Sequence, residues 1–234
     1  MNTQQKREKL CPYCARIVDK LTRDHIVSRG LFVPPYPDNL PTVKVCEECN
    51  HTKGDNEDYL RDFLILDLEA SGSAIAQTLK ATTFTRAIVS QEHGNTSKIA
   101  LAVATRGQLV ELRTPGGIIR GQAIITRIEI DKIKAVLAAM VKGFYFKQFR
   151  QVLPPTHIID AVRIEARLVP ASWDSFTLQG GQRKNLGQVF SYQSLSSEDK
   201  QLMTWQFLFY QSTLFQMATY PPSSFTPPPT RRRF

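Results

Sequence analysis

The sequence predicts an α+β fold in which a small cysteine-bounded module precedes a larger region of mixed helices and strands. Three observations predict it. All four cysteines form two CxxC pairs within residues 11–49, apolar residues recur at helical spacing over residues 131–149, and short β-rich runs separated by turn residues follow residue 98. Of the 234 residues, 42% are hydrophobic and 22% are charged, as in ordinary soluble globular proteins. A core of ordinary size is therefore expected, and wholesale disorder is not.

The first predicted elements follow a charged lead-in. Residues 1–10 are predicted to be mobile, and residues 11–56 are a short, turn-rich module. From residue 57 a set of apolar residues recurs at helical spacing until the SGS of residues 71–73, so a helix is expected there: Tyr59, Leu60, Phe63, Leu64 and Leu68. A second helix is expected from Ser73 to about Phe84, before the polar turn EHGNTS at residues 92–97.

Residues 98–130 are predicted to form a small antiparallel meander. Its strands are KIALAVAT, QLVELRT and QAIITRIEI, separated by Arg106-Gly107 and by the Pro-Gly-Gly of residues 115–117. An amphipathic helix from about Asp131 to Phe149 should pack on this sheet. Further strands are expected around residues 160–168, 188–193 and 204–218. Residues 57–220 are thus predicted to be an α+β region, and the sequence assigns it no role.

The last segment, residues 221–234, is predicted to be a disordered tail. It reads PPSSFTPPPTRRRF, and its five prolines and its arginine cluster cannot bury a core. A solvated chain end is the favoured interpretation, and nonspecific attraction to phosphate is the alternative.

Charge and hydropathy narrow the class of partner. Lys and Arg number 30 against 21 Asp and Glu, so the formal charge is +9, and the predicted pI is near 9.5. This charge favours a polyanion such as nucleic acid, although it is a weak indication alone. The sequence has no apolar run of the roughly 18 residues that span a bilayer and no signal-peptide core near its start. We therefore expect a cytoplasmic protein without a membrane partner.

The cysteine pairs are Cys11-Pro-Tyr-Cys14 and Cys46-Glu-Glu-Cys49, and they leave no cysteine unpaired. Two residues between thiolates allow a tight turn to direct both sulfurs at one tetrahedral ion. A reducing compartment disfavours disulfides, so the spacing predicts a structural zinc site, with reduced free thiols or a redox pair as the alternative. Metal binding would then supply folding free energy that a small module needs.

The segment between the pairs, residues 15–45, exceeds the roughly 15 to 20 residues of a typical zinc ribbon. It contains Asp24-His25-Ile26 and then Asn39-Leu40, and the second pair continues through Asn50 to Lys53. This ordered series resembles the cysteine-flanked form of the HNH endonuclease family, also called His-Me finger or ββα-metal nucleases. That form has CxxC, an acidic residue or His followed by His, Asn-Leu, and then CxxCN and Lys. The resemblance covers about residues 11–55, and the segments EDYLRDFL and KGFYFKQFRQVLP loosely resemble uncharacterised bacterial HNH proteins.

The resemblance implies a role for each matching residue. Asp24 and Asn50 would bind one catalytic divalent cation, and His25 would activate water as the general base. Asn39 would brace the loop that holds His25, and Lys53 would steady the charge of the phosphate. The expected partner is nucleic acid, with DNA as the favoured substrate.

Physical chemistry supports these roles independently of the family. Successive side chains of a strand point in opposite directions, so Asp24 can hold metal while His25 faces phosphate. A neutral imidazole is a suitable base near neutral pH, and a hard cation held by oxygen ligands can stabilise charge at phosphorus. Arg29 is a second candidate for the phosphate contact.

The sequence departs from the family pattern at two places. Ser28 stands three positions after His25, where many members have Pro, and Asn50 stands where others have His. An amide oxygen suits Mg²⁺ or Mn²⁺ better than zinc as the catalytic ion. His51 is an alternative ligand to Asn50. Asp55 and Asp58 fit the outer coordination shell of the catalytic ion, but a solvated helix start explains two acidic residues there at least as well.

The remaining histidines and aromatic residues are assigned no chemistry. His93 and His157 are interpreted as surface histidines without a partner in the sequence, and one aromatic cluster is interpreted as core because of its helical spacing: Phe144, Tyr145, Phe146 and Phe149. The favoured function is a divalent-metal-dependent DNA endonuclease. The alternative is a catalytically inactive zinc module that binds nucleic acid or protein. A zinc finger on an enzyme of another kind would need a catalytic set after residue 60, and we find no such pattern there.

Overall fold

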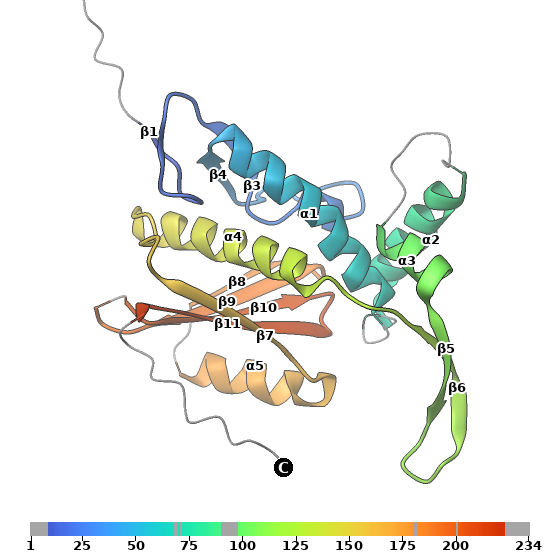
Figure 1. Cartoon of the computed structure of the whole chain (residues 1–234). Helices are drawn as coiled ribbons and strands as arrows, with labels where there is room; N and C mark the ends of the chain where they lie inside the picture. The colour runs from blue at the N-terminus through green and yellow to red at the C-terminus, as the bar shows by residue number, and fades with distance from the viewer. Residues whose placement is uncertain are drawn as a thin grey trace, which may run out of the picture.

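The computed structural model describes residues 9–67, 70, 72–89, 98–179, 182–199 and 201–222 (Figure 1). The fold is α+β, as predicted. The lead-in up to residue 8, the polar turn at 92–97 and the tail from residue 223 lie outside the described residues. Within the described residues, no helix combines the length and the apolar character that crossing a bilayer requires.

The N-terminal part consists of two short hairpins and a long helix. Strands β1 (Lys9–Leu10) and β2 (Ile17–Val18) pair antiparallel around the first cysteine pair. Strands β3 (Thr22–His25) and β4 (Thr42–Val45) pair antiparallel as well, and the short 3₁₀ helix η1 (Arg29–Leu31) lies in the segment between them. Helix α1 (Glu47–Leu66) follows β4 directly. Together β3, β4 and α1 make a ββα unit.

Helix α1 begins ten residues before the predicted start at residue 57. The prediction missed these residues because the first half of the helix lacks the apolar repeat on which the prediction depended. Glu47 and Glu48 occupy its first turn, where acidic side chains are favourable near the helix N-terminus. The helix runs through residue 56, so the N-terminal module and the α+β region share one helix.

The larger part is built on a five-stranded antiparallel sheet in the order β7-β11-β10-β9-β8. Its strands are β7 (Ile158–Ile164), β8 (Gln182–Leu186), β9 (Phe190–Ser196), β10 (Met203–Phe209) and β11 (Thr213–Tyr220). Helix α4 (Ile130–Phe149) covers one face, and helix α5 (Val169–Leu178) covers the other (Figure 1). Alternation along β10 explains this layering, since Phe207 contacts Phe144 of α4 while Gln206 bonds Ser172 of α5.

Three predictions of secondary structure are wrong. Residues 98–105 form helix α3 (Lys98–Arg106) and not a strand, because alanines favour the helix and Ile99 and Val103 recur one turn apart. The meander is therefore only a hairpin, β5 (Gln108–Arg113) with β6 (Ile119–Ile125). Helix α4 packs on the five-stranded sheet and not on this hairpin, contrary to the prediction (Figure 1). The strand expected over 160–168 ends at Ile164 and is followed by η3 (Ala166–Leu168) and α5. Helix α2 (Ala74–Val89) confirms the second predicted helix, and β8 was not predicted.

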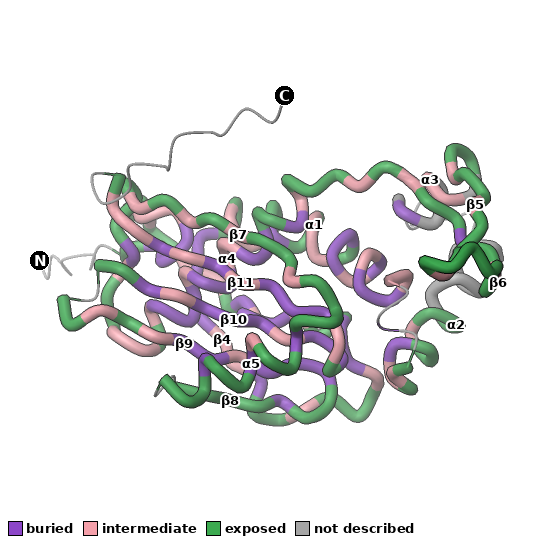
Figure 2. The backbone as a smooth tube through the Cα atoms, turned by 90° about the horizontal axis from the view of Figure 1, so that it is seen from below, coloured by how far each residue is buried: buried purple, intermediate pink, exposed green. Residues whose placement is uncertain are grey.

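One buried core joins the ββα unit to the sheet (Figure 2). Helix α1 packs on α4, and Ile26 lies so close to Gly143 of α4 that a Cβ there would be 2.9 Å from Ile26 Cγ1. The Tyr210 hydroxyl, from the turn after β10, donates to the Leu31 carbonyl oxygen at 3.0 Å. The segment after His25 is therefore held by both α4 and the sheet. In contrast, the β5–β6 hairpin is largely exposed.

Candidate functional site

The four cysteines form a compact cluster between the first hairpin and the start of α1. All four sulfur atoms lie within 4.8 Å of one another, and Cys14 Sγ is 3.9 Å from Cys46 Sγ. Four sulfurs about 2.3 Å from a tetrahedral ion would lie about 3.8 Å apart, so the spacing fits. Cys11, Cys14, Cys46 and Cys49 are thus positioned to bind a metal ion, as the CxxC pairs predicted.

Backbone and side-chain N–H groups donate to the sulfurs. The Cys46 backbone N–H donates to Cys11 Sγ at 3.3 Å, and Arg16 Nε donates to Cys14 Sγ at 3.3 Å. Burial opposes ionisation of Cys14, but the hydrogen bonds from Arg16 outweigh it and lower the Cys14 pKa to about 6. Arg16 also pairs with Glu48 on the first turn of α1. These hydrogen bonds favour the thiolate of Cys14, the form in which cysteine binds a metal, whereas burial raises the pKa of Cys11 and of Cys49.

The ββα unit brings three of the predicted site residues to one interface. Asp24 and Thr22 are two residues apart on β3, so they share the strand face that α1 covers. Asn50 and Lys53 are one helical turn apart on α1, and they contact Thr22 and Asp24 respectively. Strand β3 and helix α1 therefore bring Asp24 and Asn50 to the same interface, each in contact with a different partner.

Asp24 is buried in a cluster of charged side chains that the sequence did not predict. The Tyr13 hydroxyl donates to Asp24 Oδ2 at 2.6 Å, and Lys53 Nζ lies 3.0 Å from the same oxygen. Lys53 also pairs with Glu57 and donates to the His25 carbonyl oxygen at 2.7 Å. Its side chain is only 2% exposed, so its ammonium faces these partners and not solvent. Two carboxylates therefore share one buried ammonium.

Burial governs the titration of this cluster. It raises the Glu57 pKa, and the neighbouring Lys53 charge partly offsets the rise. Burial, followed by the negative charge of Asp24, raises the Tyr13 pKa well above its ordinary value. Tyr13 thus stays a neutral donor to Asp24. Sequence reasoning missed both Tyr13 and Glu57; the one available signal was Glu57 four residues after Lys53 on a helix.

The side-chain oxygen of Asn50 has no hydrogen-bond partner among the described residues. Asn50 Nδ2 donates to Thr22 Oγ1 at 3.1 Å, and Thr22 Oγ1 donates its own hydrogen to the Val45 carbonyl oxygen at 3.3 Å. Because the Thr22 hydroxyl has only one hydrogen, it must accept from the amide, which fixes the orientation of that amide. Among the described residues, no group donates to Asn50 Oδ1.

His25 is half-buried and, by alternation, lies on the strand face opposite Asp24, together with Arg23. Burial lowers the His25 pKa, the positive charges of Arg23 and Arg29 lower it further, and Asp24 opposes them. The imidazole is therefore neutral near neutral pH and able to accept a proton.

The other predicted site residues lie outside the buried cluster. Asn39 is exposed, and its side chain makes no hydrogen bond within the described part of the chain, although its segment is tied to β3 by the Ile26 N–H to Pro41 O bond of 2.9 Å. Arg29 lies over the Tyr36 ring, 4.3 Å from its centroid.

The alternative ligands near the second cysteine pair face solvent. His51 is exposed and lies 3.7 Å from exposed Asp55. Asp58 pairs with Arg61 at 2.7 Å. None of these side chains takes part in the Asp24 cluster. The predicted core role of the aromatic cluster is confirmed for Phe144 and Tyr145, which are buried.

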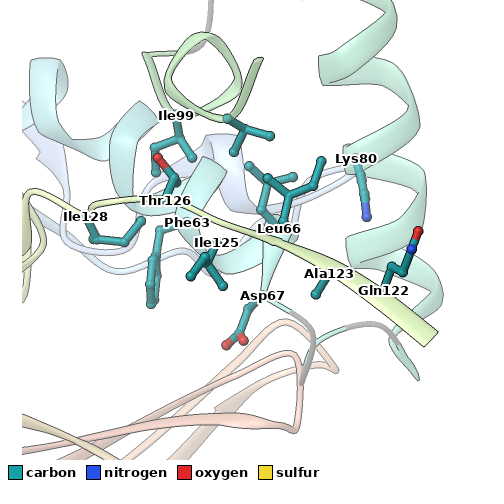
Figure 3. Close-up of a pocket in the computed structure, with 12 residues that line it drawn as sticks. Phe63, Leu66, Asp67, Lys80, Ile99, Gln122, Ala123, Ile125, Thr126 and Ile128 are labelled. Carbon is teal, nitrogen blue, oxygen red and sulfur yellow. The ribbon is translucent and has the colours of Figure 1, made fainter. Parts of the chain in front are cut away.

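A separate hollow of about 490 Å³ lies between the end of α1, α3 and the β5–β6 hairpin (Figure 3). Its lining is mostly apolar, with Phe63 and Ile125 beside one another and Asp67 at its edge. Asp67 is held by Arg163 at 2.6 Å. Among the described residues that line it, the charged side chains are Asp67, which Arg163 holds, and Lys80. The interface of β3 and α1 brings more charged side chains into direct contact, so it is the stronger candidate site.

Comparison of the chain with known protein families, with curated proteins and with solved structures finds no match.

Proposed function

We propose that the N-terminal part of this chain is an HNH-type endonuclease module that hydrolyses phosphodiester bonds in DNA. The observation that carries the proposal is the ββα unit, in which one face of strand β3 directs Asp24 toward Lys53 and Thr22 toward Asn50 of α1, while His25 lies on the opposite face. The order of these residues along the chain is that of the family, and the arrangement is the one its ββα name describes.

Zinc is the ion that we assign to the four cysteines. Four thiolates in a closed tetrahedral set are the ligands of structural zinc sites, and soft sulfur ligands disfavour magnesium, calcium and manganese. The ion would join the first hairpin to the start of α1 and so fix the helix that carries Asn50 and Lys53.

A second ion, Mg²⁺ or Mn²⁺, fits the oxygen atoms at the interface of β3 and α1. Asn50 Oδ1 is free of hydrogen bonds within the described residues, and Asp24 and Glu57 carry more negative charge than Lys53 neutralises. Asp24 and Asn50 would hold this ion, as hard oxygen ligands do. When bound, the ion stabilises negative charge on the phosphate and on the leaving oxygen.

His25 acts as the general base. Its imidazole accepts a proton from water, the water oxygen bonds to phosphorus, and the bond from phosphorus to the leaving sugar oxygen breaks. Lys53 acts as a positioning residue, since its ammonium holds the His25 carbonyl oxygen and the Asp24 carboxylate. Arg29 is exposed beside this site, and we assign it the contact with the phosphate.

One observation favours a second function, binding of nucleic acid without cleavage. Lys53 neutralises Asp24 in the buried cluster, so the carboxylate already has a cation. A module that keeps this ion pair would bind DNA but hold no catalytic metal.

Plasmid nicking by the zinc-loaded chain separates the two functions. With Mg²⁺ or Mn²⁺ present, the proposal expects supercoiled plasmid to become nicked, and it expects Asp24→Asn to abolish nicking while zinc content is unchanged. Asp58→Asn is the matched control, because Asp58 is an exposed carboxylate paired with Arg61. Binding of the plasmid without nicking under every divalent metal would contradict the proposal and support the binding module.

A further inference from the structure

A second hollow, which is polar and has a volume of about 760 Å³, opens between the loop before β4, the end of α4 and the edge strand β8. Three cations converge on it: Lys147 and Arg150 from the end of α4, and Lys184 from β8. Burial lowers the Lys147 pKa, and the positive charges of Lys184 and Arg150 lower it further, so the three repel one another. No acidic side chain of the described residues lines the hollow.

The positive charge continues to the strand that carries His25. Lys147 and Arg150 also line an adjoining hollow of about 540 Å³, together with Arg23 and Lys44 of the β3–β4 hairpin. Arg23 and Lys44 face each other across that hairpin, and like charges in this position are destabilising. We call these five residues, Arg23, Lys44, Lys147, Arg150 and Lys184, the basic strip.

The basic strip has no counterion among the residues that the structure describes. None of its five side chains forms an ion pair with any residue that the structure describes, whereas Arg61 and Arg163 are each paired with a carboxylate. Two sets of mutually repelling cations, Arg23 with Lys44 and Lys147 with Arg150 and Lys184, thus lie together with no ion pair in the described part of the chain. Such an arrangement is favourable when an anion with several charges lies along it.

The rest of the lining is suited to a nucleotide chain. Tyr192 lines the hollow, and within the described residues its hydroxyl makes no hydrogen bond; burial raises its pKa to about 12, so it remains a donor. Asn39 and Asn185 contribute amides at the same hollow. Phosphates take hydrogen bonds from cations and hydroxyls, and amides bond base edges and sugars. An acidic protein partner would instead need an apolar anchor at the centre of the contact, and this lining is mainly polar.

We infer that the basic strip is the path of the DNA backbone, which leaves His25 over Arg23 and Lys44 and enters the hollow at Lys147, Arg150 and Lys184. Arg23 shares the strand face of His25, so the strip begins beside the proposed base. This inference rests on the proposed function for its substrate, and it assigns the α+β region the task of holding that substrate.

Binding of a labelled DNA duplex, measured by fluorescence anisotropy without Mg²⁺ or Mn²⁺, tests the inference. The double variant Lys147→Gln/Lys184→Gln should bind about tenfold more weakly at low salt and should reduce the slope of log K against log salt by about 1.8, which corresponds to two lost phosphate contacts. The control Lys80→Gln/Lys134→Gln removes the same charge from exposed lysines off the strip, and it should change affinity by less than about twofold. Equal effects of the two double variants, or no effect of the first, would overturn the inference.

Two further measurements distinguish a lost DNA contact from misfolding of the variant and from binding of any polyanion. The Lys147→Gln chain should unfold at the same or a higher temperature than the natural chain, because repulsion is relieved, so weaker binding would not reflect misfolding. Competition by polyglutamate that is as strong as competition by DNA would overturn the assignment to nucleic acid. Failure of the proposed function is distinguishable, since a chain that binds DNA through the strip but never nicks it supports the strip and contradicts the nuclease.

Discussion

Lys53 is the residue on which the interface of β3 and α1 depends. Its ammonium contacts two carboxylates and the backbone of His25, and the side chain is almost fully buried. A buried carboxylate that loses its cation is left with an uncompensated charge, which is far less favourable than the intact pair. Lys53 therefore links the stability of the fold to the position of His25.

Replacement of Lys53 by methionine should destabilise the zinc-loaded chain by about 3 to 5 kcal/mol, because Asp24 and Glu57 would remain buried without a cation. The measurement is urea denaturation at neutral pH. Lys132→Met is the matched control, because Lys132 pairs with exposed Glu129 near the protein surface, and a loss below about 1 kcal/mol is expected. Equal losses of unfolding free energy for the two variants would contradict the prediction that the buried cluster stabilises the chain more than an exposed ion pair does.

His25 should titrate below its ordinary pKa of 6.5, for the reasons of burial and positive neighbours given above. Between the two values the unfolded chain binds more protons than the folded chain, so this group's contribution to stability is present above pH 6.5 and decreases as pH falls through the folded pKa. NMR titration of the imidazole measures the shift directly. Arg23→Gln should raise the His25 pKa, and Arg16→Gln, at the cysteine cluster, should leave it unchanged.

For single residues of the candidate site, the sequence identifies those that match a spaced motif. It misses those that reach the site only through folding. Asp24, His25 and Asn50 were found because their order along the chain is informative. Tyr13 lies inside the first CxxC pair and Glu57 seven residues after Asn50, and only the packing of α1 on β3 brings them to Asp24. No local pattern marks a tyrosine as the donor to a distant carboxylate.

Among the elements, helix α4 connects the candidate site to the sheet. Its Gly143 allows Ile26 to pack directly on the helix, one residue after His25. Its amphipathic repeat predicted it almost to the residue, because a long, strongly periodic helix is the clearest signal in a sequence. Helix α3 was mistaken for a strand because a short apolar run fits both periods, and only contact with neighbouring helices decides between them.

Two glycine-to-alanine substitutions in helices should have opposite effects. Gly143→Ala places a Cβ against Ile26 and should destabilise the chain by about 1 to 3 kcal/mol, as overpacking does. Gly54 lies at an exposed position of α1, where an added Cβ would meet no atom within 4 Å. Gly54→Ala should therefore stabilise the chain by up to about 1 kcal/mol through helix propensity. Thermal unfolding of the two variants checks the pair, and stabilisation by Gly143→Ala would contradict the close packing of α4 on Ile26.

For the whole molecule, the four clustered cysteines and the sheet belong to one structure. Cys11 and Cys46 are part of the same buried core as Phe207 and Met217 of the sheet. The CxxC spacing predicted the cluster of four cysteines, but it could not show that α1 and α4 join the two parts, since contacts between distant segments leave no periodic trace in a sequence.

Removal of the structural ion should therefore affect more than the first hairpin. A strong chelator, or Cys46→Ser, should release about one zinc ion per chain and unfold the ββα unit, with loss of tertiary near-ultraviolet circular dichroism. The α4 packing that depends on Ile26 should loosen as well, which hydrogen exchange over residues 130–149 would detect. An unchanged metal content in Cys46→Ser would contradict the four-cysteine site.

The rate of DNA cleavage by a His25→Ala variant tests the central proposal most directly. It is compared with His51→Ala, which removes an exposed histidine on α1 outside the Asp24 cluster. In a nicking assay with Mg²⁺ or Mn²⁺ and zinc-loaded protein, loss of the general base predicts a rate at least about 100-fold lower for His25→Ala and an unchanged rate for His51→Ala. Cleavage by His25→Ala at the rate of the natural chain would contradict the assignment of His25 and, with it, the proposed nuclease site.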